Sequence, residues 1–235
     1  MIKGILFDKD GTLLEFLTLW HGIIGEVLEE LNLRYSVSKE TIEKIKRLSG
    51  YNQNNFGKES RIQFLATTQI ADLWMESLGE EAERITYKEL IDLFNEKAEA
   101  DNLEITALKG VKELLEYLKD KNYILGVATA DMEQSTRTGL VKAGILHYFD
   151  FIGFNEESKN PKPSPDMALH FCRQMNLAPW ELLIVGDSVT DMEFASNAGA
   201  HFIGIKTDYN EYEKFIGHGK PVVENIYDII QAMNL

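Results

Sequence analysis

The sequence predicts an α/β fold in which a parallel β-sheet is flanked by helices and an all-helical segment is inserted after the first strand. From about residue 105 onward, short apolar runs alternate with amphipathic stretches, and one more apolar run, IKGILFD, begins the chain. Residues 15–103 instead show helical periodicity and no convincing strand. Apolar runs joined by helices are typical of strands buried on both faces of a parallel sheet.

The expected strands are short runs rich in branched and aromatic residues. In chain order they are IKGILFD (2–8), YILGVAT (123–129), FDFIGF (149–154), LLIVGD (182–187), HFIGIK (201–206) and PVVE (221–224). Segments such as GVKELLEYLKDK (110–121) and DMEFASNAGA (191–200) separate them and carry apolar residues at helical spacing. This alternation predicts one sheet covered by helices.

The inserted segment is expected to form helices, because its apolar residues recur at steps of three and four. The helical stretches are LWHGIIGEVLEELNL (19–33), SKETIEKIKRLSG (38–50), KESRIQFLATTQIADLWMESLG (58–79) and TYKELIDLFNEKAEA (86–100). Ser38 and Thr86 are the expected N-caps, and GYNQNNFG (50–57) reads as an exposed polar loop. We therefore expect two domains, one of residues 1–14 with 104–235 and one of residues 15–103.

Composition excludes several classes of partner. The chain has 235 residues, of which 44% are hydrophobic, and a formal net charge of −14. That charge repels nucleic acid and anionic membranes, so neither is expected as a partner. The single cysteine, Cys172, is expected in the core of a protein from a reducing compartment. Asp8 and Asp10 interrupt the first apolar run too early for a signal peptide, which favours a cytoplasmic location.

Chemically capable side chains follow four of the expected strands. They are Asp8 and Asp10, Thr129, Lys162, and Asp187 with Asp191. The carboxyl ends of parallel strands share one edge of the sheet, so these groups should converge. Converging carboxylates repel one another unless a cation joins them, and oxygen ligands without a His or Cys cluster favour Mg²⁺. A metal next to a lysine suits a phosphate group.

Each motif also has a structural interpretation. DKDG could begin a calcium-binding loop, but Leu13 and Leu19 stand where that loop needs Gly and Glu. As an isolated segment, DKDGT could equally be an ordinary turn, and GDSVTD could be a strand end followed by an N-cap. Lys162 alone would be a solvated loop charge. The occurrence of all four groups in order, each after a strand, favours a functional site.

With these motifs in place, the sequence resembles the haloacid dehalogenase superfamily, in its phosphoglycolate phosphatase and β-phosphoglucomutase-like branch. Its first motif, DxDGT, is matched at residues 8–12, and its second at Thr129. The third is matched by Lys162 followed by Pro163, and the fourth, GDxxxD, at residues 186–191. The resemblance spans the whole chain and implies a Rossmann-like, doubly wound core with an all-helical cap inserted after the first motif.

The resemblance also implies a reaction. Asp8 would attack phosphorus and form an aspartyl phosphate, while Asp10 would protonate the leaving oxygen and later accept a proton from water. Mg²⁺ would be held by Asp8, Asp187 and the backbone carbonyl of Asp10. The expected function is therefore the hydrolysis of a small-molecule phosphomonoester.

The remaining motif residues would bind the phosphoryl group or orient its ligands. Thr129 and Lys162 would bind phosphoryl oxygens together with backbone N–H groups around Lys9 and Ala130. Asp191 would orient metal-bound water or Lys162. Many relatives carry Asn or Ser where this chain has Ala130, which offers only its backbone.

Alternative functions use the same core. A β-phosphoglucomutase-like sugar phosphomutase would return the phosphoryl group to a sugar, and a non-catalytic regulator would keep the scaffold without turnover. A dehalogenase or a phosphonatase fits less well, because Asp10 would have no role in the first and is usually replaced in the second. Substrate choice is expected to lie in the helical insertion. Lys58 and Arg61 could bind an anionic or hydroxylated substrate tail, but a solvated helix face is favoured for them, and His21 could either pack within the insertion or face the core domain. The sequence carries no signal for an oligomeric state.

Overall fold

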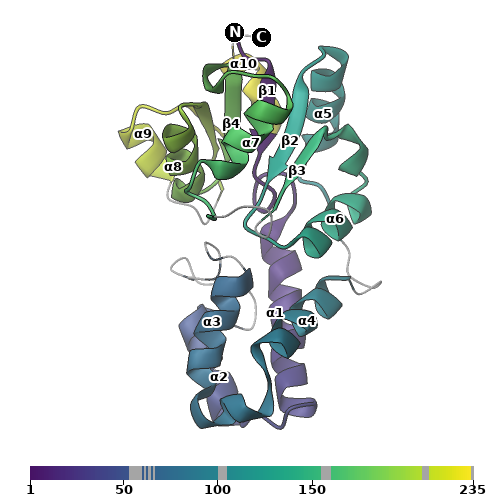
Figure 1. Cartoon of the computed structure of the whole chain (residues 1–235), viewed down its shortest axis with the longest axis vertical. Helices are drawn as coiled ribbons and strands as arrows, with labels where there is room; N and C mark the ends of the chain where they lie inside the picture. Colours follow the sequence, from purple (N-terminus) through teal and green to yellow (C-terminus); the bar gives the residue numbers. More distant parts are fainter. Residues whose placement is uncertain are drawn as a thin grey trace. The chain divides into compact units, whose positions relative to one another are not determined.

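The computed structural model describes residues 1–52, 60, 62, 65, 67–99, 105–154, 160–207 and 212–233. The chain divides into two compact units, one made of residues 1–15 and 105–235 and the other of residues 16–104 (Figure 1). The first unit contains the sheet and is called the core unit here, and the second is the helical unit. Assignment of the helical unit as a cap over the active site remains a prediction.

The core unit is built on a six-stranded sheet in which every pair of neighbours is parallel. Its strands, in the spatial order β3-β2-β1-β4-β5-β6, are Phe151–Gly153, Ile124–Ala128, Gly4–Phe7, Leu182–Gly186, His201–Ile205 and Val222–Val223. All six lie within the runs expected from sequence. The order reverses at β1, which is the feature of a doubly wound sheet that creates a ligand-binding edge.

The register of the three central strands aligns their carboxyl ends. Phe7 of β1 pairs with Val127 of β2 on one side and with Val185 of β4 on the other. Asp8 therefore follows β1 directly, and Thr129 and Asp187 each come two residues after a partner of Phe7. The alternation of strands and helices thus delivers the predicted residues to one sheet edge.

Six α-helices accompany the sheet in the described part of the core unit. They are α5 (Val111–Asp120), α6 (Glu133–Lys142), α7 (Asp166–Gln174), α8 (Val189–Ala198), α9 (Tyr212–Gly217) and α10 (Ile229–Ala232). Helices α7 and α8 contact the strands directly, α7 at β2 and β3 and α8 at β4 and β5 (Figure 1). These contacts hold the segment that precedes α7 and the start of α8 at the carboxyl edge of the sheet.

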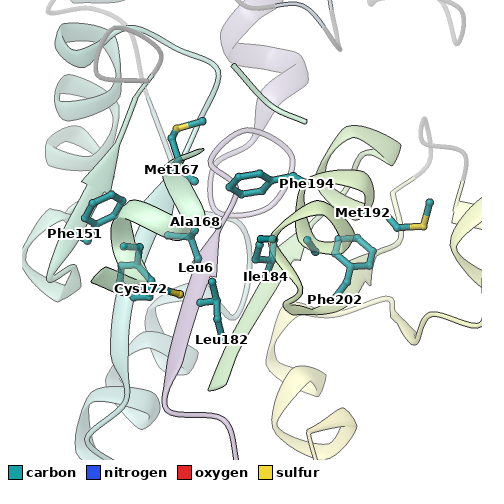
Figure 2. Close-up of a cluster of buried hydrophobic side chains, with 14 of the residues drawn as sticks. Leu6, Phe151, Met167, Ala168, Cys172, Leu182, Ile184, Met192, Phe194 and Phe202 are labelled. Atoms are coloured by element: carbon teal, nitrogen blue, oxygen red, sulfur yellow. The ribbon is translucent and has the colours of Figure 1, made fainter. Parts of the chain in front are cut away.

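The core beneath these two helices is almost wholly apolar. Leu6 and Ile184 from the sheet belong to one cluster of buried side chains with Phe194 of α8 and Cys172 of α7 (Figure 2). Cys172 is a buried free cysteine, as the sequence predicts, and burial raises the pKa of its thiol. Because apolar burial contributes roughly 25 cal/mol per Å², this cluster stabilises the packing of α7 and α8 on the sheet.

The helical unit contains four α-helices among its described residues, α1 (Phe16–Leu33), α2 (Lys39–Ser49), α3 (Thr67–Leu78) and α4 (Tyr87–Glu99). Ser38 caps α2, since its hydroxyl accepts a hydrogen bond from the Thr41 amide at 3.2 Å. Thr86 does the same for α4, accepting from the Glu89 amide at 3.2 Å. Both predicted N-caps are therefore confirmed.

Within the third expected stretch, α3 spans Thr67–Leu78; of residues 58–66 only 60, 62 and 65 are described, none of them α-helical, and the others lie outside the described residues. The 3₁₀ helix Gly79–Arg84, which links α3 to α4, was not predicted from the sequence. Its start coincides with Gly79 at a φ of 57°, a left-handed conformation that glycine adopts without the strain of a Cβ.

The candidate substrate-contacting residues lie mostly beyond what the structure describes. Lys58, Arg61 and residues 53–57 of the polar loop are outside the described residues. His21 is described, and its ring stacks on Tyr51 with centroids 4.5 Å apart. Its Nε2 donates a hydrogen bond to the carbonyl oxygen of Asn52 at 2.7 Å. Among the described helices, none has the length and apolar character needed to cross a membrane.

Candidate active site

Asp8 stands at the centre of the site, immediately after β1. Its backbone amide donates to the carbonyl oxygen of Val185 at 2.8 Å, so the last hydrogen bond of the sheet fixes its position. Its carboxylate Oδ1 accepts from Lys162 Nζ at 2.7 Å, and the side chain is 14% exposed. Asp8 is thus held through both its backbone and its carboxylate, and its side chain is largely buried.

Lys162 joins Asp8 to Asp191. Its Nζ lies 2.7 Å from an oxygen of each, and its side chain is buried. The ring of Phe194 lies under the ammonium group, with its centroid 5.4 Å from Nζ, a distance suited to a cation–π interaction. The loop beyond Lys162 is secured by Asn197, whose side chain donates to the Pro163 carbonyl at 2.9 Å.

Asp187 and Asp191 flank the start of α8. Ser188 is the N-cap of this helix, and its hydroxyl accepts from the Asp191 amide at 3.1 Å. In return, Oδ2 of Asp191 accepts from the Ser188 hydroxyl at 2.6 Å and from its amide at 3.2 Å. The interpretation of GDSVTD as a strand end followed by an N-cap is therefore correct, and the capping carboxylate of Asp191 also contacts Lys162.

Asp8, Asp187 and Asp191 form a group in which one carboxylate oxygen from each residue lies within 4.8 Å of the other two. Burial raises the pKa of Asp8 to about 7 against the opposing effect of Lys162. Burial, followed by repulsion from Asp8, raises the pKa of Asp187 well above its ordinary value. Clustered carboxylates of this kind fit a hard divalent cation, which would offset both effects.

Asp10 belongs to a different arrangement, which the sequence did not reveal. Its carboxylate is held by Lys9, whose Nζ is 2.8 Å from Oδ1 and 2.8 Å from Oδ2. The same Nζ lies 2.9 Å from Asp131 on the loop after β2. Burial lowers the pKa of Lys9, but the charges of Asp10 and Asp131 outweigh it and raise the pKa above its ordinary value.

Asp131 could have been found from sequence, since it follows β2 by three residues, as Asp10 follows β1. The side-chain role of Lys9 had no such signal, because a lysine in a turn is usually solvated. Sequence reasoning assigned Lys9 only a backbone contact.

Thr129 and Ala130 occupy the start of the loop after β2. The Thr129 amide donates to the Gly153 carbonyl at 3.1 Å, and its hydroxyl accepts from the Asp131 amide at 3.1 Å. Ala130 is half-buried. The structure brings Asp8, Lys162, Asp187 and Asp191 together directly, and it joins Thr129 to Asp10 through Asp131 and Lys9.

The first loop turns sharply after Asp10. Gly11 has a φ of 78°, and its amide donates to the Leu14 carbonyl at 2.9 Å. Side chains other than glycine are strained in this conformation. The turn keeps Lys9 and Asp10 at the sheet edge.

Gly186 provides a test of how tightly the fourth motif is packed. A Cβ at this position would lie 2.5 Å from Cβ and Cγ of Asp191, so Gly186→Ala must displace that carboxylate from Lys162. We expect the free energy of unfolding to fall by about 1–3 kcal/mol, and Mg²⁺ affinity to fall with it. Chemical denaturation and calorimetric titration measure the two effects.

The matched control is Gly217→Ala in α9, where no described atom lies within 4 Å of the added Cβ. It should leave both quantities near wild type. Equal behaviour of the two variants would show that the packing of Asp191 against Gly186 is unimportant.

The fold is a parallel α/β sheet, and the carboxylates at the carboxyl edge of this sheet could hold a metal ion. Both features are typical of an enzyme. Residues 5–205 match the haloacid dehalogenase-like hydrolase family. The match covers most of the 235 residues, and the chain belongs to this family. The predicted family and fold are confirmed, and the chain is an enzyme of the phosphatase type.

The similarity to known proteins extends over nearly the whole chain. A phosphoglycolate phosphatase of Nitrosospira multiformis is 28% identical over 211 residues, which cover 89% of this chain and 86% of the relative. A phosphorylated carbohydrates phosphatase of Thermotoga maritima is 23% identical, with 99% and 98% covered. A crystal structure of a predicted phosphoglycolate phosphatase from Haemophilus somnus has a TM-score of 0.69, 22% identity, and 99% and 98% coverage.

Proposed function

We propose that this protein is a Mg²⁺-dependent phosphatase that hydrolyses a small-molecule phosphomonoester through an aspartyl phosphate on Asp8. The observation that carries the proposal is the contact of buried Lys162 with both Asp8 and Asp191 at 2.7 Å. An ammonium group beside a nucleophilic carboxylate and a cation site is suited to binding the transferring phosphoryl group.

The donor set fits the metal. Asp8, Asp187 and the backbone carbonyl of Asp10 would hold Mg²⁺, and Asp191 would orient its surroundings through Lys162 and Ser188. Both oxygens of Asp191 already accept hydrogen bonds, from Lys162 and from Ser188, which favours this indirect role. When bound, the cation offsets the negative charge shared by the carboxylates and the phosphate.

The chain's own residues divide the remaining steps. Asp8 attacks phosphorus as the ester P–O bond breaks, and Asp10 delivers a proton to the leaving oxygen. Water then attacks the aspartyl phosphate, gives its proton to Asp10 and releases Asp8 and inorganic phosphate. Two of the three N–H groups of Lys162 are directed at Asp8 and Asp191, so the third can serve a phosphoryl oxygen. Thr129 and the backbone amides near Lys9 and Ala130 bind the others.

The substrate class follows from the relatives named above, which act on phosphoglycolate and on phosphorylated carbohydrates. We infer that this chain acts on a small phosphorylated acid or sugar, in the cytoplasm, with specificity supplied by the helical unit as a cap. A phosphomutase would use the same core but pass the phosphoryl group to a sugar rather than to water.

The test is Mg²⁺-dependent phosphate release from p-nitrophenyl phosphate and from a panel containing phosphoglycolate, sugar phosphates and nucleoside monophosphates. We expect release that needs the cation and prefers phosphoglycolate or sugar phosphates. Conversion of a sugar phosphate into its isomer with little free phosphate would favour the mutase. Absence of both activities in metal-replete protein would contradict the proposal and support a non-catalytic role.

Metal binding should depend on pH. Burial raises the pKa of Asp8 to about 7, so protonation of this carboxylate in the metal-free protein increases as the pH falls through that value. Protons and Mg²⁺ compete for it, so affinity should weaken by roughly tenfold or more from pH 7.5 to pH 5.5. Calorimetric titration at constant ionic strength measures the affinity. An affinity that stays constant over this range would contradict the assignment of Asp8 as a ligand.

A further inference from the structure

The lysine on which the proposed function depends lies in a loop with few backbone hydrogen-bond donors of its own. Lys162 is flanked by Pro161 and Pro163, and a proline has no amide N–H with which to hold its segment in place. The amide of Ser164 donates to the Pro161 carbonyl at 2.9 Å, which closes a turn around Lys162. The position of this turn relative to the sheet therefore depends on contacts made by its carbonyl oxygens and side chains.

Helix α8 supplies such contacts from side chains spaced three residues apart. Oδ1 of Asp191 accepts from Lys162 Nζ at 2.7 Å, and the centroid of the Phe194 ring lies 5.4 Å from the same Nζ. One step further along the helix, Nδ2 of Asn197 donates to the carbonyl oxygen of Pro163 at 2.9 Å. Residues three apart are neighbours on a helix surface, so these side chains form one strip against the loop. Two of them contact the ammonium group, and Asn197 holds the backbone beside it.

Asn197 differs from the other two residues of this strip in its exposure. Asp191 and Phe194 are buried, at 2% and 0% exposed, whereas Asn197 is exposed. Asparagine also has a lower helix propensity than alanine, so helix formation does not account for an asparagine at this position. Its hydrogen bond acts instead on Pro163, the residue next to Lys162.

We propose that Asn197 is a positioning residue that sets the place of the Lys162 ammonium group in the active site by holding the Pro163 carbonyl. The inference rests on the proposed function, in which Lys162 binds the transferring phosphoryl group. Lysine has a flexible four-carbon stem, so its backbone must be fixed for its third N–H to meet a phosphoryl oxygen at hydrogen-bond distance. Without the Asn197 amide, the turn shifts while Nζ still follows its two carboxylates, which leaves that N–H misaligned.

The experiment titrates inorganic phosphate, the product of the reaction, into Mg²⁺-replete protein in a calorimeter. Asn197→Ala should weaken phosphate binding by roughly five- to tenfold, the size of coupling that residues of one network show. Asn197→Asp keeps the shape but loses the donor, so it should weaken binding at least as much. Asn197→Gln keeps an amide donor on a longer side chain and should recover part of the loss.

A second background tests whether Asn197 acts through Lys162. Lys162→Met removes the ammonium group, so adding Asn197→Ala to it should change phosphate affinity by less than about twofold. A merely structural role would weaken binding by the same factor in both backgrounds. If the Lys162→Met protein does not fold, or binds phosphate too weakly to titrate, Asn197→Gln decides, because it must then bind phosphate more tightly than Asn197→Ala.

The matched control is Asn32→Ala in the helical unit. Asn32 also donates from a helix to a backbone carbonyl, that of Val37, at 2.8 Å. Its phosphate affinity should stay near wild type. Unchanged affinity in Asn197→Ala, an equal loss in the two alanine variants, or an equal loss in the two backgrounds would overturn the positioning role. Failure of the wild type to bind phosphate with Mg²⁺ and to release it from any ester would instead overturn the proposed function from which this inference starts.

Discussion

Asp8→Asn is expected to lower phosphate release by roughly 10⁴-fold or more while leaving the fold intact, because the amide has nearly the same shape but is a far poorer nucleophile. The structure supports this expectation, since Asp8 follows β1 directly and its carboxylate contacts Lys162 at 2.7 Å. Steady-state kinetics with saturating Mg²⁺ measures the loss, and circular dichroism checks the fold.

The control for Asp8→Asn is Asp150→Asn, which alters an aspartate that is also paired with a lysine, outside the motif segments. It should keep near wild-type turnover. If Asp8→Asn retained comparable turnover in metal-replete protein, the aspartyl-phosphate mechanism would be excluded.

Asp187→Ala is expected to weaken Mg²⁺ binding by more than about 100-fold, whereas Asp191→Asn should weaken it by roughly 10 to 100 fold. The reason lies in the partners of each carboxylate. Asp191 Oδ1 accepts a hydrogen bond from Lys162, and its Oδ2 accepts one from Ser188. Because both oxygens already accept hydrogen bonds, Asp191 is better suited to orienting these groups than to binding the metal directly. Asp187 has a carboxylate oxygen within 4.8 Å of one from Asp8 and one from Asp191, and its pKa is raised by burial and by Asp8.

Calorimetric titration of Mg²⁺ into each variant gives the order of the two effects. Asp166→Asn at the start of α7 is a suitable control, since its carboxylate contacts Asn160 rather than the group of Asp8. A greater loss in Asp191→Asn than in Asp187→Ala would mean that the two roles are exchanged.

The placement of the site could be predicted because it follows from simple properties of a parallel sheet. Apolar runs identify strands, and all strands of such a sheet end at the same edge, so Asp8 and Asp187 must approach each other. The N-caps Ser38 and Thr86 were equally readable, because hydroxyls before a helical pattern satisfy its free amides.

The partners of Lys9 could not be predicted in the same way. Its burial depends on Asp10 beside it and on Asp131, more than a hundred residues away in the chain. The local sequence around a lysine indicates only that such a residue is usually solvated. It does not indicate that two carboxylates from different loops contact Lys9. Elements without strong periodicity, such as the 3₁₀ helix Gly79–Arg84, were missed because their geometry is set by the packing of their neighbours.

The central claim is that the phosphoryl group is transferred to the carboxylate of Asp8. It is tested most directly by acid-quenching the enzyme during turnover, reducing it with borohydride and analysing the peptides by mass spectrometry. Borohydride converts an acyl phosphate to an alcohol, so residue 8 should appear as homoserine in the wild type and remain unmodified without substrate. Reduction at another residue, or no reduction in an enzyme that is turning over substrate, would contradict the account.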